Sequence, residues 1–233
     1  MADDGYSLTR LQHEAAEGAR DHIVRLLSGL KARHGLSQQR ILELGSGLGG
    51  NLALFAADNV IQGVEAVAEA AEAATRSGIP TLCADIARGP IPCGEPGWDW
   101  ILMLDVLEHL VDPHRLLEQA RAGLAPGGRI VVNVPNQFDW RGRWGLLRGR
   151  GIDASGYFPG STAWTYPHLR FCRHADLLGL LRSAGFEPIE DASALQSSLP
   201  LARHLPRVSR VLTRRWVDLA AAGFFVVCRR AGR

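Results

Sequence analysis

The residues best suited to chemistry in this chain lie where apolar stretches end, because acids and a glycine-rich turn occur there. Residues 41–51 read ILELGSGLGGN, in which Glu43 closes a short apolar run and glycines occupy alternate positions from Gly45. Glycine lets the backbone approach a ligand closely and adopt conformations that a side chain would block. A helix over residues 52–57 would add unpaired N–H groups and a positive dipole end. The segment therefore predicts a strand, a ligand-binding turn and a helix.

Further acids follow three more apolar runs, each of which predicts a strand. The runs span residues 60–64, 80–84 and 98–104, and they are followed by Glu65, by Asp85 with Ile86, and by Asp105. Glu65 lies twenty residues after the first glycine, which is typical of a carboxylate that accepts hydrogen bonds from ribose hydroxyls. Asp85 could serve a ligand or cap the next turn. The acids thus predict a nucleotide-like ligand across several strand ends.

The order of these motifs resembles a known family. The spacing G-x-G-x-G after Glu43 differs from the G-x-G-x-x-G of dinucleotide-binding folds. Together with DVLEHL at residues 105–110 and LAPGGRIVVNVPN at residues 124–136, it resembles class I S-adenosylmethionine-dependent methyltransferases over about residues 39–189. The resemblance implies S-adenosylmethionine as cofactor. It implies cofactor contacts from Glu43, Gly45, Ser46, Gly47, Gly49, Glu65, Asp85, Ile86 and Asp105.

Glu108 and His109 are the candidates for acid–base catalysis. A methyl group on a sulfonium is already activated, so the protein must mainly place the acceptor, exclude water and accept a proton from a hydroxyl. A neutral histidine suits that last task. The alternative is a structural helix start with His109 bonded to the backbone. The ubiquinone-pathway O-methyltransferases carry a similar E-x-L-E-H stretch, reported to bind a metal, but Asp105 replaces its first acid here, and we expect no metal.

A long segment after the fifth predicted strand is rich in aromatic residues. Residues 136–172 contain half of the chain's sixteen aromatics and many glycines. Long loops in compact domains are often functional, so we expect this insert to wall the acceptor site. The alternative is a satellite core beneath a loop. The polar and aromatic members expected to contact the acceptor are Asn136, Trp140, Trp164, Tyr166 and His168.

Alternating strand and helix patterns indicate one α/β domain. We expect a seven-stranded, mostly parallel Rossmann-like methyltransferase sheet whose last two strands form its antiparallel end. The predicted parts are N-terminal helices at residues 1–38, a cofactor-binding core at 39–135, the inserted cap at 136–172, and the C-terminal part of the sheet at 173–233.

A second helical pattern spans residues 201–219 and carries arginines on one face. These are Arg203, Arg207, Arg210 and Arg214, opposite Leu201, Leu205, Val208, Leu212, Trp216 and Leu219. The commoner arrangement is a solvated basic face over a packed apolar stripe, which we expect here. The alternative is docking on an anionic lipid surface or on RNA.

Composition narrows the classes of function. The formal net charge is only +2, which gives no reason to expect nucleic acid as a partner. No apolar run reaches the roughly 18 residues of a membrane span, the first residues do not resemble a signal peptide, and the cysteines lack paired spacing. We therefore expect a cytoplasmic protein, and the family resemblance implies an enzyme that methylates a hydroxyl of a small-molecule or glycan-like acceptor. The alternatives are a regulatory or scaffold protein that binds S-adenosylmethionine without turnover, and a nicotinamide-dependent oxidoreductase.

Overall fold

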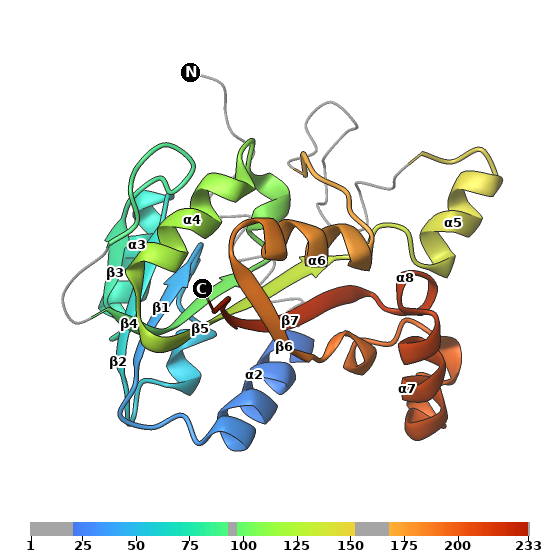
Figure 1. The fold of residues 1–233 in the computed structure, drawn as a ribbon, viewed down its shortest axis with the longest axis horizontal. Coiled ribbons are helices and arrows are strands. Elements are labelled where there is room, and N and C mark those ends of the chain that lie inside the picture. The colour runs from blue at the N-terminus through green and yellow to red at the C-terminus, as the bar shows by residue number, and fades with distance from the viewer. Residues whose placement is uncertain (1–20, 93–96, 152–167, 233) are drawn as a thin grey trace.

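The fold is built on one mixed sheet. The structure, a computed structural model, describes residues 21–92, 97–151 and 168–232. Seven strands lie in the order β3-β2-β1-β4-β5-β7-β6, and β7 runs antiparallel to both of its neighbours (Figure 1). The strands are β1 Arg40–Leu44, β2 Val60–Glu65, β3 Thr81–Cys83, β4 Trp98–Leu104, β5 Leu124–Pro135, β6 Phe186–Asp191 and β7 Gly223–Arg230. The predicted sheet is confirmed.

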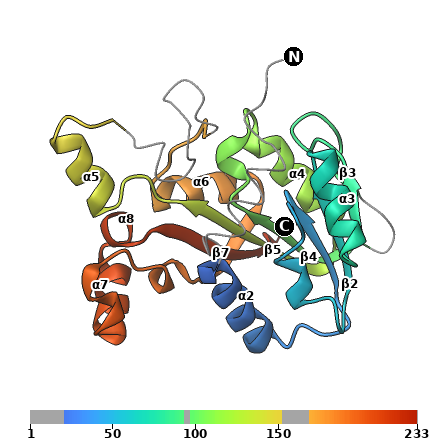
Figure 2. The ribbon, with the colours of Figure 1, turned by 180° about the vertical axis from the view of Figure 1, so that it is seen from behind.

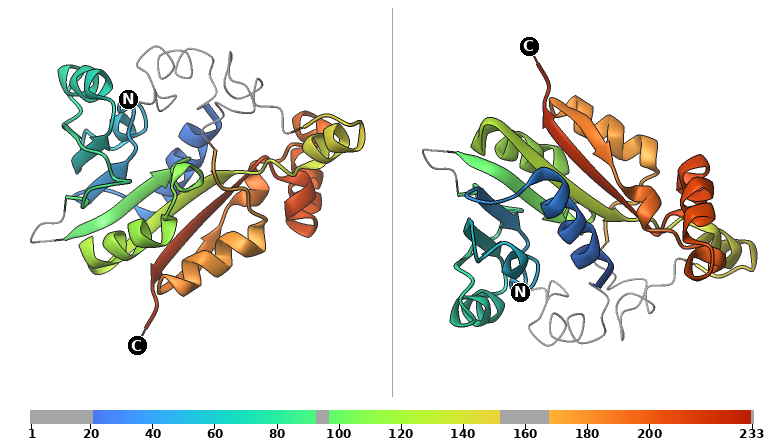
Figure 3. Two further views of the ribbon diagram at one scale, coloured as in Figure 1. Left: turned by 90° about the horizontal axis from the view of Figure 1, so that it is seen from above. Right: turned by 90° about the horizontal axis from the view of Figure 1, so that it is seen from below.

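Helices cover both faces of this sheet, which explains why its central strands are apolar on both sides. The helices are α2 Asp21–His34, α3 Ala68–Arg76, α4 Pro113–Gly123 and α6 His174–Ser183. Residues of α4 and α6 pack against one side of the sheet, and Ile23, Leu27 and Leu30 of α2 pack against the other. Figure 2 and Figure 3 show α2 on the face away from α4 and α6.

The prediction of an α-helix after the glycine turn is wrong. Only the single 3₁₀ turn η1, Leu52–Leu54, forms there. The Asn59 side-chain amide donates at 2.9 Å to the Phe55 carbonyl, which a longer helix would use for its own hydrogen bonds, and the Asn51 side-chain amide donates to the Glu43 carboxylate at 2.7 Å. A full helix dipole is therefore missing from this turn, and the polar contacts must come from loop N–H groups and side chains.

Two other segments differ from their sequence patterns. The predicted loop at residues 136–172 contains the helix α5, Trp140–Leu147, which starts where the Asp139 carboxylate accepts from the N–H groups of Arg141 and Gly142. The predicted helix at residues 201–219 is broken into η4 Pro200–Arg203, α7 Pro206–Arg215 and α8 Val217–Ala220, after the 3₁₀ turn η3 Ser193–Leu195. A proline at the start of α7 fits a new helix and cannot continue an old one.

No helix in the described part of the chain is long and apolar enough to cross a membrane.

Candidate active site

The glycine turn adopts a backbone that few other residues tolerate. Gly45, Gly47 and Gly49 have φ values of 72°, 54° and 79°, all in the left-handed region. A Cβ at Gly45 would lie 2.8 Å from the Val106 side chain, and one at Gly49 would lie 2.9 Å from Ile79. The turn is thus packed against Val106, which follows β4, and against Ile79, which precedes β3.

Glu65 holds this turn on the end of β2. Its carboxylate accepts from the Gly47 N–H and from the Val67 N–H, both at 2.9 Å, and the side chain is buried. The sequence predicted a ribose contact at Glu65. Since each carboxylate oxygen accepts more than one hydrogen bond, these contacts leave capacity for a hydroxyl.

Ser46 lies inside the turn with an unused hydroxyl. It is 1 % exposed, and its Oγ has no hydrogen-bond partner within the described residues. A buried hydroxyl without a partner is costly, so it marks a place where a ligand group is expected. Glu43 is also buried, and its carboxylate accepts from Asn51.

Asp85 and Ile86 lie at the end of β3. The Asp85 carboxylate accepts from the Ala87 N–H at 2.9 Å and lies 3.4 Å from Arg88 Nε, so it caps a turn, the alternative that the sequence left open. Ile86 is buried in the core beside this turn.

Asp105 ends β4 in an unusual backbone conformation. Its φ of 56° is left-handed, which aspartate tolerates better than most residues. Asn133 holds Asp105 in this conformation. The Asn133 side-chain amide donates to the Asp105 carboxylate at 2.6 Å, and the Asn133 backbone carbonyl accepts from the Asp105 N–H at 2.9 Å. Gln196 in turn donates to Asn133 at 2.9 Å. The Asp105 carboxylate is thereby exposed at the carboxyl edge of the sheet, where ligands bind in open α/β folds.

Glu108 and two histidines meet just beyond Asp105. Glu108 and His109 belong to the 3₁₀ turn η2, Leu107–His109, and His168 comes from the far end of the insert. Glu108 Oε1 lies 4.0 Å from His109 Nε2 and 3.9 Å from His168 Nε2. The two imidazole rings pack edge to face with centroids 4.6 Å apart. The predicted catalytic pair is thus joined by a residue predicted only to bind the acceptor.

The environment of Glu108 favours its neutral form. Burial raises the pKa of the Glu108 carboxyl well above its ordinary value, and the negative charge of Asp105 raises it further. The side chain is 3 % exposed, and neither carboxyl oxygen has a hydrogen-bond partner among the described residues. Glu108 is therefore suited to exchange a proton with a histidine or to receive a hydrogen bond from a ligand.

Backbone contacts bring His168 to this cluster. The N–H groups of Leu169 and Arg170 both donate to the Glu108 carbonyl, at 2.8 and 3.0 Å. The Arg170 guanidinium also bonds the carbonyls of Leu110 and Val111. Gln137 Nε2 lies 3.1 Å from His168 Nδ1, so this amide donates to Nδ1 and the proton of neutral His168 lies on Nε2, toward Glu108.

An apolar cavity of about 180 Å³ lies beside Glu108. Leu107, Val134, Leu177 and Cys172 contribute to its walls. Burial, followed by the charge of Glu108, raises the pKa of the Cys172 thiol to about 12, so this thiol is not a nucleophile near neutral pH. The cavity can take the apolar part of a ligand whose polar group reaches Glu108.

The other predicted acceptor contacts fall elsewhere. The Asn136 amide donates to the carbonyls of Asp218 and Ala221, at 3.1 and 2.8 Å, which uses both of its N–H groups in tying the insert to α8. The Trp140 indole N–H donates to the Ser198 carbonyl at 3.0 Å. Trp164 and Tyr166 lie outside the described residues. Sequence reasoning gave no role to Asn133, Gln137, Arg170 and Gln196, although Asn133 lies within the motif at residues 124–136, because they act through contacts between distant segments.

The same cluster is also a candidate metal centre. One ligand atom from each of Glu108, His109 and His168 lies within 4.8 Å of the others. Two imidazoles and a carboxylate are ligands that zinc and similar ions accept. The expectation of no metal therefore needs a direct test.

Comparison with known proteins places the chain in a family. A family model described as "Methyltransferase domain" matches residues 11–191, so the chain belongs to this family. An uncharacterized 37.1 kDa protein in transposon TN4556 of Streptomyces fradiae is 27 % identical over 92 % of this chain and 66 % of its own length. Ubiquinone biosynthesis O-methyltransferase of Paraburkholderia phymatum is 25 % identical over 64 % of this chain and 65 % of its own length.

Solved structures share the fold. Burkholderia thailandensis 1,6-didemethyltoxoflavin-N1-methyltransferase, solved with 1,6-didemethyltoxoflavin and S-adenosylhomocysteine, superposes with a TM-score of 0.59 at 18 % identity. The match covers 94 % of this chain and 84 % of that one. The chain spans between 51 % and 66 % of the length of the curated relatives it matches.

Proposed function

We propose that this chain transfers a methyl group from S-adenosylmethionine to a hydroxyl of a small-molecule or glycan-like acceptor. The observation that carries the proposal is the meeting of Glu108, His109 and His168 next to Asp105, at the sheet edge that also holds the glycine turn. Membership of the methyltransferase domain family supports this reaction over the nicotinamide-dependent alternative.

The residues of the glycine turn fit S-adenosylmethionine. The left-handed glycines allow a close approach, and the buried Ser46 hydroxyl has an unfilled hydrogen-bonding position. Glu65 would accept from the ribose hydroxyls, and the exposed Asp105 carboxylate would bind the cationic amino group. The bound cofactor supplies an electrophilic methyl group. The solved neighbour with S-adenosylhomocysteine supports the same choice of cofactor.

The histidine cluster would supply the proton acceptor. As the acceptor oxygen forms its bond to the methyl carbon, the hydroxyl proton must leave, and His109 Nε2 would take it. The neutral Glu108 carboxyl, whose Oε1 lies 4.0 Å from His109 Nε2, would help to position the imidazole ring. His168, fixed by Gln137, would keep the Glu108 carboxyl in place. The apolar cavity beside Glu108 would hold the apolar part of the acceptor and keep water out.

The test is transfer of radiolabelled methyl from S-adenosylmethionine to a panel of hydroxylated acceptors, with and without prior dialysis against a chelator. We expect labelled methyl ethers and the same rate after chelation. Loss of activity on chelation, restored by zinc, would instead make the cluster a metal centre. Cofactor binding without transfer to any acceptor would favour the regulatory alternative.

A further inference from the structure

The helix α7 is packed in the opposite way from its sequence pattern. Its buried residues are Ser209 and Thr213, at 1 % and 0 % exposure, one helical turn apart. Their hydroxyls lie 2.6 and 2.8 Å from the Ser197 hydroxyl, and this trio attaches the helix to the domain. The prediction that an apolar stripe of this helix packs against the domain is therefore wrong.

The apolar side chains of this region face outward instead. Val211 is 68 % exposed, and in the neighbouring helix α5 Leu147 is 79 % exposed. Figure 1 and Figure 2 show α8 between α5 and α7, and Figure 3 shows all three at one end of the molecule. The exposed apolar residues of these elements are Trp144, Leu146, Leu147, Leu205, Val208, Val211, Trp216 and Leu219, which we call the outer apolar surface.

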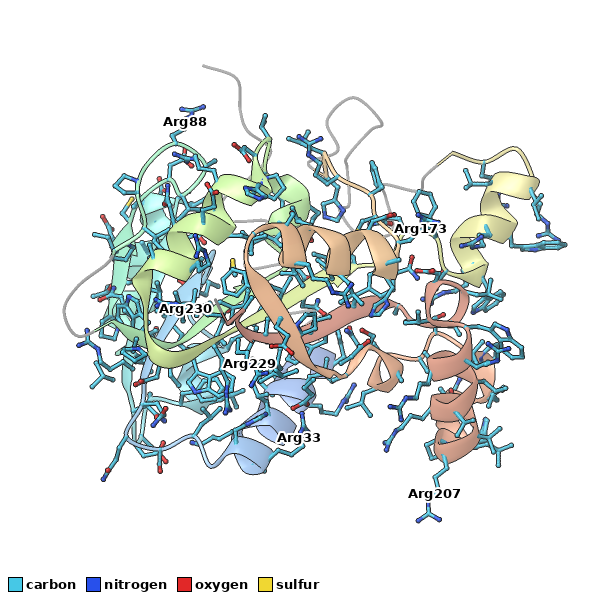
Figure 4. All side chains as sticks on the ribbon, viewed as in Figure 1. Arg33, Arg88, Arg173, Arg207, Arg229 and Arg230 are labelled. Atoms are coloured by element: carbon cyan, nitrogen blue, oxygen red, sulfur yellow. The ribbon has the colours of Figure 1, made fainter. Side chains whose placement is uncertain are left out.

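Arginines are interspersed with this surface. Residues 140–151 and 199–219 contain nine arginines and one acid, Asp218, in a chain with 26 basic and 24 acidic residues, so the rest of the chain carries more acids than bases. Arg203, Arg207, Arg210, Arg214 and Arg215 are exposed, and none of them forms an ion pair with any part of the chain that the structure describes. Figure 4 shows Arg207 pointing away from α7 and from the rest of the molecule.

We propose that the outer apolar surface docks on an anionic lipid bilayer. Helices that lie in a membrane interface typically expose tryptophan, leucine and valine between basic residues. Their apolar groups enter the acyl boundary, and their arginines contact anionic headgroups. The charge of the surface complements such a membrane, while the acid-rich remainder of the molecule is repelled by it.

The other occupants fit less well. RNA would contact the arginines but would leave the leucines and valines, six of the eight apolar residues, without suitable partners, because single strands bind by stacking on aromatic rings. A second copy, related by a two-fold axis, would bring two arginine-rich clusters of the same sign face to face.

The experiment is co-sedimentation of the full chain with vesicles of phosphatidylcholine, with and without about one third phosphatidylglycerol. We expect binding only to the anionic vesicles, weakened by salt. Replacing Arg207→Gln together with Arg214→Gln should weaken binding about 30-fold, since each basic residue near such a surface contributes roughly 5-fold. The matched pair Arg25→Gln and Arg76→Gln, which removes the same charge from α2 and α3, should bind like the wild type.

A second pair of variants tests the apolar part. Val211→Glu with Leu147→Glu should abolish vesicle binding, whereas Val60→Glu, an equally exposed position at the start of β2, should not. Circular dichroism and thermal melting establish that each variant is folded. The proposal is overturned by an absence of binding to anionic vesicles, by equal losses in the matched controls, by binding to an RNA homopolymer in place of vesicles, or by self-association that the α7 variants abolish.

Discussion

At the scale of single residues, the burial of Glu108 dominates the chemistry of the site. A carboxyl whose pKa is higher in the folded protein than in the unfolded chain binds its proton more tightly when folded. The free energy of unfolding therefore falls as the pH rises from the unfolded pKa, about 4.3, toward the folded value. Above that range the cost of an ionised buried carboxylate remains in full.

Glu108→Gln removes this titration and should be progressively stabilising as the pH rises. The difference in melting temperature between the variant and the wild type should increase above pH about 4.3 and reach on the order of 5 °C. The matched control is Glu72→Gln on α3, where the side chain is 71 % exposed and its surface ion pair contributes little. Thermal melting curves recorded across this pH range measure the effect. A difference in melting temperature between Glu108→Gln and the wild type that does not change with pH would show that Glu108 is not held neutral.

His109→Ala should lower the rate of methyl transfer on the order of 100-fold, because it removes the proton acceptor. The affinity for S-adenosylmethionine should stay the same, since we propose that His109 faces the acceptor and makes no contact with the cofactor. His114→Ala, a 40 % exposed histidine on α4, is the control and should leave the rate unchanged. Steady-state kinetics with calorimetric binding separate the two effects, and an equal loss in binding and in rate would assign His109 to cofactor binding.

The sequence identified Glu108 and His109 because they follow a strand within a recognisable motif. It could not place His168 beside them, since their contact depends on how residues 168–170 bond to the Glu108 carbonyl. Nor could the sequence show that the Asn136 side-chain amide donates to the carbonyls of Asp218 and Ala221 and not to an acceptor molecule. Pairings of this kind join segments far apart in the chain and leave no periodic signal.

At the scale of elements, the glycine turn carries the strictest requirement. Gly49→Ala places a side chain at a φ of 79° and within 3.1 Å of three Ile79 atoms. Left-handed backbone costs a residue with a side chain about 1–2 kcal/mol, so cofactor affinity should fall about 10-fold or more. Gly50→Ala is the matched control, because its Cβ would meet nothing within 4 Å. Calorimetric titration of both variants gives the result, and similar affinities would show that the turn does not hold the cofactor.

Elements could be predicted closely where a regular pattern ends at clear turn residues. The strand Trp98–Leu104 was predicted with its observed bounds, because a mostly apolar run is flanked by such residues. The hydrophobic periodicity of residues 201–219 led to a wrong prediction of which face of α7 is buried. Periodicity assigns Ser209 and Thr213 to the polar, solvated face, but their hydroxyls form the hydrogen bonds that attach the helix to the domain. The prediction of a helix after the glycine turn was wrong for a related reason, because polar side chains form hydrogen bonds there. The Asn59 amide donates to the Phe55 carbonyl, and the Asn51 amide donates to Glu43.

At the scale of the whole molecule, the strand order explains where the site lies. β1 is the first strand in the chain, and its neighbours β2 and β4 are reached by connections on opposite sides of it. Ligands in open α/β sheets bind where the order reverses in this way. The glycine turn, Glu65 and Asp105 follow β1, β2 and β4 respectively, so one crevice collects the predicted cofactor contacts. The alternation of strands and helices was enough to predict this layout.

Calorimetric titration of the full chain with S-adenosylhomocysteine and, separately, with NAD is the decisive measurement of which cofactor the glycine turn binds. We predict saturable binding of S-adenosylhomocysteine with one site per chain, weakened by Gly49→Ala and unchanged by Gly50→Ala, and no binding of NAD. Binding of NAD alone, or of neither compound by the folded protein, would contradict it.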